Sequence, residues 1–155
     1  MVALQRILAP LDGSELSERA LPLAAALAQK FNSEIILLRV LDLPSPALGM
    51  RYPENHWMRE ALQYSHREAQ EYLEARRAEL AGQGVRTRIL VRDESPAEDI
   101  LLVAADEQID LIVMSSHGMG GPSPWTAGSV AHKILQHSPC PVLLVRQRLE
   151  QAQDL

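Results

Sequence analysis

A lone cysteine, Cys140, provides the only thiol in this chain of 155 residues. One thiol cannot form an internal disulfide, and it excludes a zinc site built from several cysteines. Its place between two prolines at the start of an apolar run favours a small buried side chain. The histidines at positions 56, 66, 132 and 137 show no metal-binding spacing, so we predict no metal site.

Long apolar runs and positive charge are scarce as well. No apolar stretch approaches the roughly 20 residues that span a bilayer, and the N-terminus lacks the features of a signal peptide. Lys and Arg number 15 against 20 Asp and Glu, a formal net charge of −5. This balance provides no basic surface for nucleic acid. We therefore expect a soluble cytoplasmic protein that binds no nucleic acid and does not insert into membranes.

The remaining composition is that of an ordinary globular domain. Hydrophobic residues make up 46% of the chain and charged residues 23%, which argues against disorder. At roughly 150 residues per domain, the length predicts one unit. We assign residues 1–148 to that domain and residues 149–155 to a C-terminal tail.

Short apolar runs alternate with longer segments of helical spacing, which predicts an α/β fold. Most runs are apolar on both faces, as buried parallel strands are, whereas the third carries Arg86 and Arg88 and belongs nearer a sheet edge. Strict alternation implies a single-domain, doubly wound parallel sheet with helices on both faces. The expected strands are 7–9, 34–41, 85–91, 111–114 and 142–145, and the expected helices are 14–31, 57–81, 96–107 and 128–137.

Local signals define several boundaries between these elements. Ser95 and Glu98 form a capping box around a proline at the first helical position, so a helix should begin there. Gly82 and Gly84 should end the preceding helix, and Pro22 should bend the first helical stretch or delay its start. Residues 42–56 carry three prolines and no periodicity, which predicts one long variable loop.

Two segments that follow expected strands form the candidate binding site. Ligands of a doubly wound sheet bind beyond the carboxyl ends of the strands, where the strand order reverses. Residues 10–14 (PLDGS) leave the first strand, and residues 115–130 leave the fourth strand and open a helix. The glycine-rich segment that leads to the helix start at Gly128 and Ser129 would let backbone amides bind a phosphate group. The alternative is a tight turn in which Ser129 only caps its own helix.

Several motifs, taken in order, resemble those of the universal stress protein family over most of the chain. Residues 7–15 (ILAPLDGSE) resemble the family's first strand and turn, and residues 110–114 (DLIVM) resemble its fourth strand. Residues 128–131 (GSVA) and 139–145 (PCPVLLV) resemble its last helix and strand. The resemblance implies a Rossmann-like, five-stranded parallel sheet with the strand order 3-2-1-4-5.

The ATP-binding branch of that family has the pattern G-x₂-G-x₉-G-[ST] after the fourth strand, and Ser115-x₂-Gly118-x₉-Gly128-Ser129 keeps its spacing. The resemblance implies bound ATP, alone or with Mg²⁺, whose phosphates follow these glycines. It also implies that Asp12 contacts the ribose or phosphate side, a suitable role for an acceptor-only carboxylate. Backbone near Leu11 and Val40 would frame the adenine. The full implied set is Pro10, Leu11, Asp12, Val40, Met114, Ser115, His117, Gly118, Gly128, Ser129 and Val130.

Other functions stay open at this point. Ser115 stands where the pattern has glycine, and residues 122–125 (PSPW) are bulkier than the family's basic stretch. If Ser115 and Trp125 close the pocket, the protein is a nucleotide-independent dimeric scaffold, and Asp12 only holds its turn. A slow ATPase or phosphotransferase is the other alternative, although we find no nucleophile–base pair and assign no catalytic residue.

The last apolar run is the expected contact between two copies of the chain. Residues 141–145 (PVLLV) have no charge before Arg146 and, beyond Pro141, lack the usual protection of an edge strand. Pairing across a two-fold axis would cover this edge, and the family resemblance also implies dimers. We predict a homodimeric, ATP-binding stress-response protein whose nucleotide orders residues 118–127 and alters the surface shown to an unknown protein partner.

Overall fold

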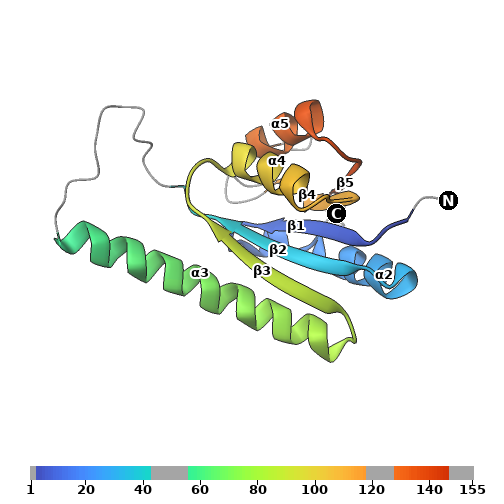
Figure 1. Cartoon of the computed structure of the whole chain (residues 1–155), viewed down its shortest axis with the longest axis horizontal. Helices are drawn as coiled ribbons and strands as arrows, with labels where there is room; N and C mark the ends of the chain where they lie inside the picture. Colours follow the sequence, from blue (N-terminus) through green and yellow to red (C-terminus); the bar gives the residue numbers. More distant parts are fainter. Residues whose placement is uncertain (1–2, 43–55, 118–127, 147–155) are drawn as a thin grey trace, which may run out of the picture.

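A computed structural model describes residues 3–42, 56–117 and 128–146 and arranges them in three layers, a sheet between two layers of helices (Figure 1). The sheet is parallel, with the order β3-β2-β1-β4-β5, so the predicted fold class and strand order are confirmed. The strands are β1 (Arg6–Leu11), β2 (Glu34–Val40), β3 (Arg86–Arg92), β4 (Leu111–Ser115) and β5 (Val142–Val145). The helices are α1 (Glu15–Glu18), α2 (Leu21–Phe31), α3 (His56–Gly82), α4 (Pro96–Asp106) and α5 (Ser129–His137).

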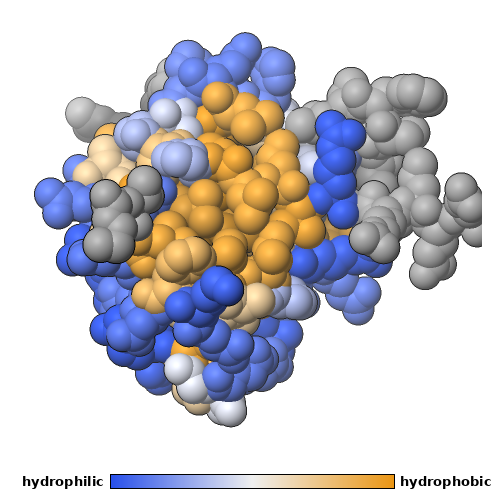
Figure 2. Space-filling model, turned by 90° about the vertical axis from the view of Figure 1, so that its right-hand side faces the viewer, coloured by the Kyte–Doolittle hydropathy of each residue, from blue (hydrophilic) through white to orange (hydrophobic). Residues whose placement is uncertain are grey.

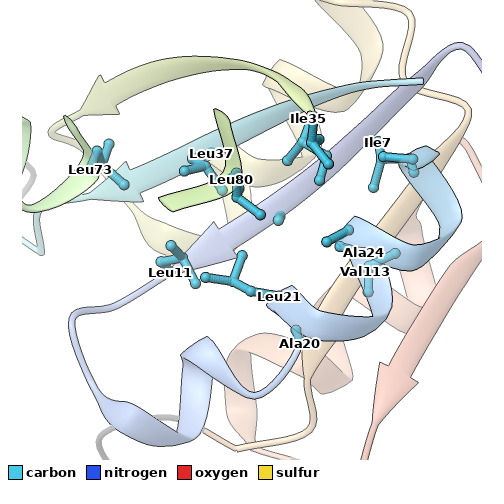
Figure 3. Close-up of a cluster of buried hydrophobic side chains, with 14 residues drawn as sticks. Ile7, Leu11, Ala20, Leu21, Ala24, Ile35, Leu37, Leu73, Leu80 and Val113 are labelled. Atoms are coloured by element: carbon cyan, nitrogen blue, oxygen red, sulfur yellow. The ribbon is translucent and has the colours of Figure 1, made fainter. Parts of the chain in front are cut away.

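Alternation along the strands divides the core into two layers. Ile7 and Ile35 face α2 and α3, in the layer drawn in Figure 3. Leu8 and Ile36 face α4 and α5 on the opposite side of the sheet. All four side chains are fully buried, and each such burial contributes about 1.5–3 kcal/mol to folding. The central strands are therefore apolar on both faces because helices cover both faces.

The helix boundaries follow most of the sequence signals. Pro22 lies in the first turn of α2, where a missing N–H is tolerated. The expected helix 14–31 is divided into α1 and α2, so Pro22 marks a later helix start, one of the two effects expected of it. Past the end of α3, Gly84 takes the left-handed conformation with a φ of +77°. Helix α4 begins at Pro96 as predicted, but the predicted side-chain cap is wrong. Ser95 makes no such hydrogen bond, and Asp99 instead accepts the N–H of Glu94 at 3.1 Å.

The two edge strands of the sheet differ in charge. Strand β3 carries Arg86, Arg88 and Arg92, and its predicted edge position is confirmed. The Arg88 guanidinium donates to Glu107 at 2.6 Å, which lowers the pKa of the Glu107 carboxyl. Charged side chains of this kind protect an edge from pairing with another chain. Strand β5, at the other edge, consists of four half-buried aliphatic residues.

Candidate functional site

The carboxyl ends of β1, β2 and β4 meet where the strand order reverses. Strand β1 pairs with β2 as far as Leu11 opposite Arg39. Its pairs with β4, within the described strands, lie at Ile7 and Leu8. Pro10 lies beyond those pairs and has no N–H to donate to a ladder. The two segments chosen from the sequence therefore lie at the switch point of an open α/β sheet, the usual ligand position of such folds.

Asp12 lies half-buried in the turn that follows β1. Its Oδ1 accepts the N–H of Ser14 at 2.9 Å and also the Ser14 hydroxyl. The Asp12 N–H donates to Ser17 Oγ at 3.3 Å, and the Ser17 N–H donates to Ser14 Oγ at 3.1 Å as the cap of α1. The turn-holding role considered for Asp12 is therefore present. The same bonds give its carboxylate a defined orientation at the sheet edge.

The guanidinium of Arg39, which the sequence did not indicate as a site residue, lies next to Gly13. Gly13 has a φ of +87°, which favours glycine, and a Cβ there would lie 3.4 Å from Arg39 Nη2. The half-buried Arg39 is the residue before Val40 on β2, so its guanidinium packs against the Asp12 turn. An available signal was the positive charge that interrupts the apolar part of the run EIILLRVL near its end.

The end of β4 lies against the start of α5. Ser115 and Ser116 are buried, and the Ser116 carbonyl accepts the N–H of Gly128 at 2.8 Å. A Cβ on Gly128 would lie 3.3 Å from that carbonyl oxygen, so glycine permits the close approach. Beside this contact, Ser116 Oγ lies 3.0 Å from His117 Nδ1. Strand and helix are joined here across residues that are distant in the sequence.

Gly128, rather than Ser129, is the N-cap of α5, so the interpretation of Ser129 as its own cap is wrong. Gly128 has an extended backbone conformation, as N-cap residues do, and Ser129 is the first residue of the helix. The first amides of a helix, here those of Ser129, Val130 and Ala131, have no acceptor within the helix, and glycine at the N-cap offers no side chain to accept them. Together with the positive end of the helix dipole, these amides suit an anion.

The other predicted site residues lie at the same edge. Leu11 and Met114 are buried, and Pro10 and Val40 are half-buried. Val40 and Met114 belong to the core layer that α5 covers. The structure thus brings together, at the carboxyl edge, those predicted residues that it describes. Gly118 and residues 119–127, with Trp125, lie outside the described residues, as do most of the expected loop 42–56 and the tail 149–155.

Three further features of the described residues bear on function. Residues 3–42, 56–117 and 128–146 contain no group of three or more His, Cys, Asp or Glu that could hold a metal ion. In the same part of the chain, no helix combines the length and hydrophobicity that crossing a membrane requires. Cys140 is half-buried, and burial raises the pKa of its thiol, which disfavours the reactive thiolate.

Comparison with known proteins gives a uniform result. The model of the universal stress protein family matches residues 3–146. The universal stress protein YxiE of Bacillus subtilis is 33% identical over 145 residues, which cover 91% of this chain and 98% of YxiE. Among solved structures, that of MJ0577, a universal stress protein of Methanocaldococcus jannaschii, superposes with a TM-score of 0.82 at 30% identity. The superposition covers 95% of this chain and 99% of MJ0577. A family member from Arabidopsis thaliana with AMP bound has the same fold, with a TM-score of 0.67 at 18% identity and coverage of 94% and 93%.

Proposed function

Because the chain belongs to the universal stress protein family, we propose that it binds ATP at the carboxyl edge of its sheet. The observation that carries this proposal is the 2.8 Å bond from the Gly128 N–H to the Ser116 carbonyl. This bond holds the start of α5 against the end of β4, and β4 is also in contact with α1. Phosphate oxygens match the amides that begin such a helix. The AMP-bound neighbour supports an adenine nucleotide as the ligand.

In the proposed arrangement, phosphates lie along Gly118 and the amides of Ser129 and Val130. The Asp12 carboxylate accepts a ribose hydroxyl, and the adenine lies against backbone near Leu11 and Val40. No Arg or Lys occurs between Gly118 and Lys133 in the sequence. The phosphate charge is therefore met by amides, by the dipole of α5 and by Mg²⁺ bound to the nucleotide. We further propose that the protein works in the cytoplasm as a signalling module rather than as an enzyme.

Isothermal titration calorimetry with ATP tests the nucleotide proposal. We expect saturable heat from the unmodified protein and at least tenfold weaker binding by Asp12→Ala, the effect of losing about 1.5–3 kcal/mol from one hydrogen bond to a charged group. Asp106→Ala, at the exposed end of α4, is the matched control and should bind ATP normally. Absence of heat at millimolar ATP would contradict the proposal and favour the scaffold. Steady phosphate release that Asp12→Ala abolishes would favour the slow ATPase.

We also propose that β5 pairs with β5 of a second copy of the chain. Charge protects the β3 edge, whereas the residues of β5 are aliphatic and half-buried. Figure 2 shows a broad apolar expanse on the side of the molecule where β5 and α2 lie. The residues Leu23 and Phe31 on α2 are 40% and 50% exposed. Such an expanse is typical of a protein interface.

Sedimentation velocity tests the proposed dimer. The unmodified protein should sediment as a dimer, and Leu144→Arg on β5 should shift it toward the monomer. The control is Leu102→Arg on α4, where the leucine is 55% exposed, and it should leave the dimer intact. A monomeric unmodified protein, or an unchanged dimer in Leu144→Arg, would contradict pairing through β5.

A further inference from the structure

We propose that Glu18, Tyr72 and Arg76 act as a clamp by which α3 positions the Asp12 turn, and that they thereby set the affinity for nucleotide. The inference rests on the proposed nucleotide site. Helix α1 has four residues, far fewer than the roughly 12 needed for even marginal stability of an isolated helix. Its conformation must therefore depend on contacts with the rest of the molecule.

Glu18 supplies the contact with α3. Its Oε1 accepts the Tyr72 hydroxyl at 3.0 Å and Arg76 Nη1 at 2.6 Å. The Glu18 and Arg76 side chains are 22% and 27% exposed, so water screens this pair less than a fully exposed one. The Arg76 guanidinium also lies 5.6 Å from the centroid of the Tyr72 ring. Two side chains of α3 thus converge on a single carboxylate oxygen of α1.

The protonation state of Tyr72 suits this arrangement. Burial and the acceptor Glu18 raise the pKa of the Tyr72 phenol above its usual range. The hydroxyl therefore remains protonated at neutral pH and continues to donate to Glu18. The hydrogen bond to Glu18 likewise raises the pKa of Arg76, so the guanidinium keeps its charge across the physiological range.

A short series of hydrogen bonds links the clamp to the Asp12 carboxylate. The Glu18 N–H and the Ser17 hydroxyl both donate to the Ser14 carbonyl, at 3.3 and 2.8 Å. Ser14 donates to Asp12 Oδ1, and the Asp12 N–H donates to Ser17 Oγ. Moving Glu18 therefore displaces the groups that orient Asp12. Because such coupling is reciprocal, bound nucleotide should also restrain the contact between α1 and α3.

Another ion pair of α3 provides a matched control. Arg77 Nη2 lies 2.6 Å from Glu74 Oε2, and both side chains are more than 40% exposed. This pair is internal to α3, three residues apart, and therefore does not join α3 to α1. Arg77→Gln thus removes an α3 ion pair of similar length while leaving the clamp in place. It separates the effect of positioning α1 from a general loss of charge on the helix.

The experiment is an ATP titration of Glu18→Gln, Tyr72→Phe and Arg77→Gln, with each Glu18 and Tyr72 change repeated in an Asp12→Ala background. We expect about fivefold weaker binding for Glu18→Gln and Tyr72→Phe, as for the loss of one coupled contact. Arg77→Gln should bind normally. In the Asp12→Ala background, the clamp substitutions should cause no further loss, because the clamp acts through Asp12. Amide exchange at residues 14–18 should accelerate in both clamp variants, and circular dichroism checks their folding.

Three results would overturn the proposal. Folded Glu18→Gln and Tyr72→Phe variants that bind ATP as tightly as the unmodified protein would refute the clamp and leave the nucleotide site standing. An equal loss with and without Asp12 would mean that these residues do not act through its carboxylate. Absence of binding by the unmodified protein would overturn the nucleotide site and the clamp together. The titration of the unmodified protein alone identifies that last case.

Discussion

Replacing Gly128 with alanine tests the close approach of β4 and α5 on which the proposed site depends. The new Cβ would lie 3.3 Å from the Ser116 carbonyl oxygen and 3.9 Å from the His117 Cα. The same oxygen accepts the Gly128 N–H at 2.8 Å, so relief of the contact must lengthen this hydrogen bond. Residue 128 has a φ of −60°, which alanine adopts easily. The expected effect is therefore steric rather than a consequence of backbone strain.

The size of the effect follows from what has to move. The contacted oxygen belongs to the backbone of Ser116, which is 4% exposed and cannot rotate away as a side chain would. Overpacking a well-packed position lowers the free energy of unfolding by about 1–3 kcal/mol. Because this contact must lengthen by only a few tenths of an ångström, we expect a loss near the lower limit, about 1 kcal/mol. The same shift moves the amides of Ser129 and Val130, so ATP should bind severalfold more weakly.

Gly82→Ala is the matched control for this prediction. Gly82 ends α3, and a Cβ there would meet nothing within 4 Å. Alanine should stabilise this position by about 0.5–1 kcal/mol, without changing the affinity for ATP. Urea denaturation measures the free energy of unfolding of both variants, and calorimetry measures their ATP affinity. A Gly128→Ala protein as stable as the unmodified one, with unchanged ATP affinity, would refute the close approach of β4 and α5.

Three further substitutions test other parts of the structure. Ser115→Gly restores the family pattern at the end of β4, so calorimetry should show severalfold tighter ATP binding, while urea denaturation shows a loss of about 0.5–1 kcal/mol for glycine in a strand; unchanged or weaker binding would contradict an obstructing role. Ile112→Ala empties a fully buried position and should lower the free energy of unfolding by about 2–5 kcal/mol; an unchanged urea midpoint would contradict its burial. Glu107→Gln should cost about 0.5–1 kcal/mol at pH 7, because the bond from Arg88 lowers the pKa of Glu107 and its ionised form favours the folded state. This cost should shrink below about pH 4.3 and vanish once the carboxyl is protonated in both states; a cost that is independent of pH would exclude the ion pair as its source.

Much of the fold could be predicted because burial on two faces leaves a clear sequence signal. The apolar runs of β1, β2 and β4 identified the central strands, and the arginines of β3 indicated an edge. The strand ends were harder to predict. Strand β1 continues through Pro10 to Leu11, because its ladder with β2 extends further than its pairs with β4. A proline read alone suggests the end of a strand, and only the neighbouring strands decide the outcome.

The candidate site was partly predictable for a related reason. Asp12 and Gly128 belong to motifs with fixed local spacing, so the sequence indicates them directly. The clamp residues Glu18 and Tyr72 lie 54 positions apart, and no local pattern connects them. Serine is common at the N-cap, so a cap role for Ser129 was the alternative considered, whereas Gly128 takes that position and its close contact with β4 favours glycine there. Interactions between distant segments are the part that sequence patterns leave out.

Backbone amide NMR during titration with ATP is the measurement that tests the proposed site most directly. We predict chemical-shift changes centred on residues 11–13, 40, 115–117 and 128–130, at the carboxyl edge of the sheet. Residues 86–88 and 107 lie near the amino ends of the strands, on the opposite side of the sheet from the proposed site. Their shifts should stay unchanged and serve as an internal control. No shifts at several millimolar ATP, or shifts centred on that opposite side, would contradict a nucleotide site between β1, β4 and α5.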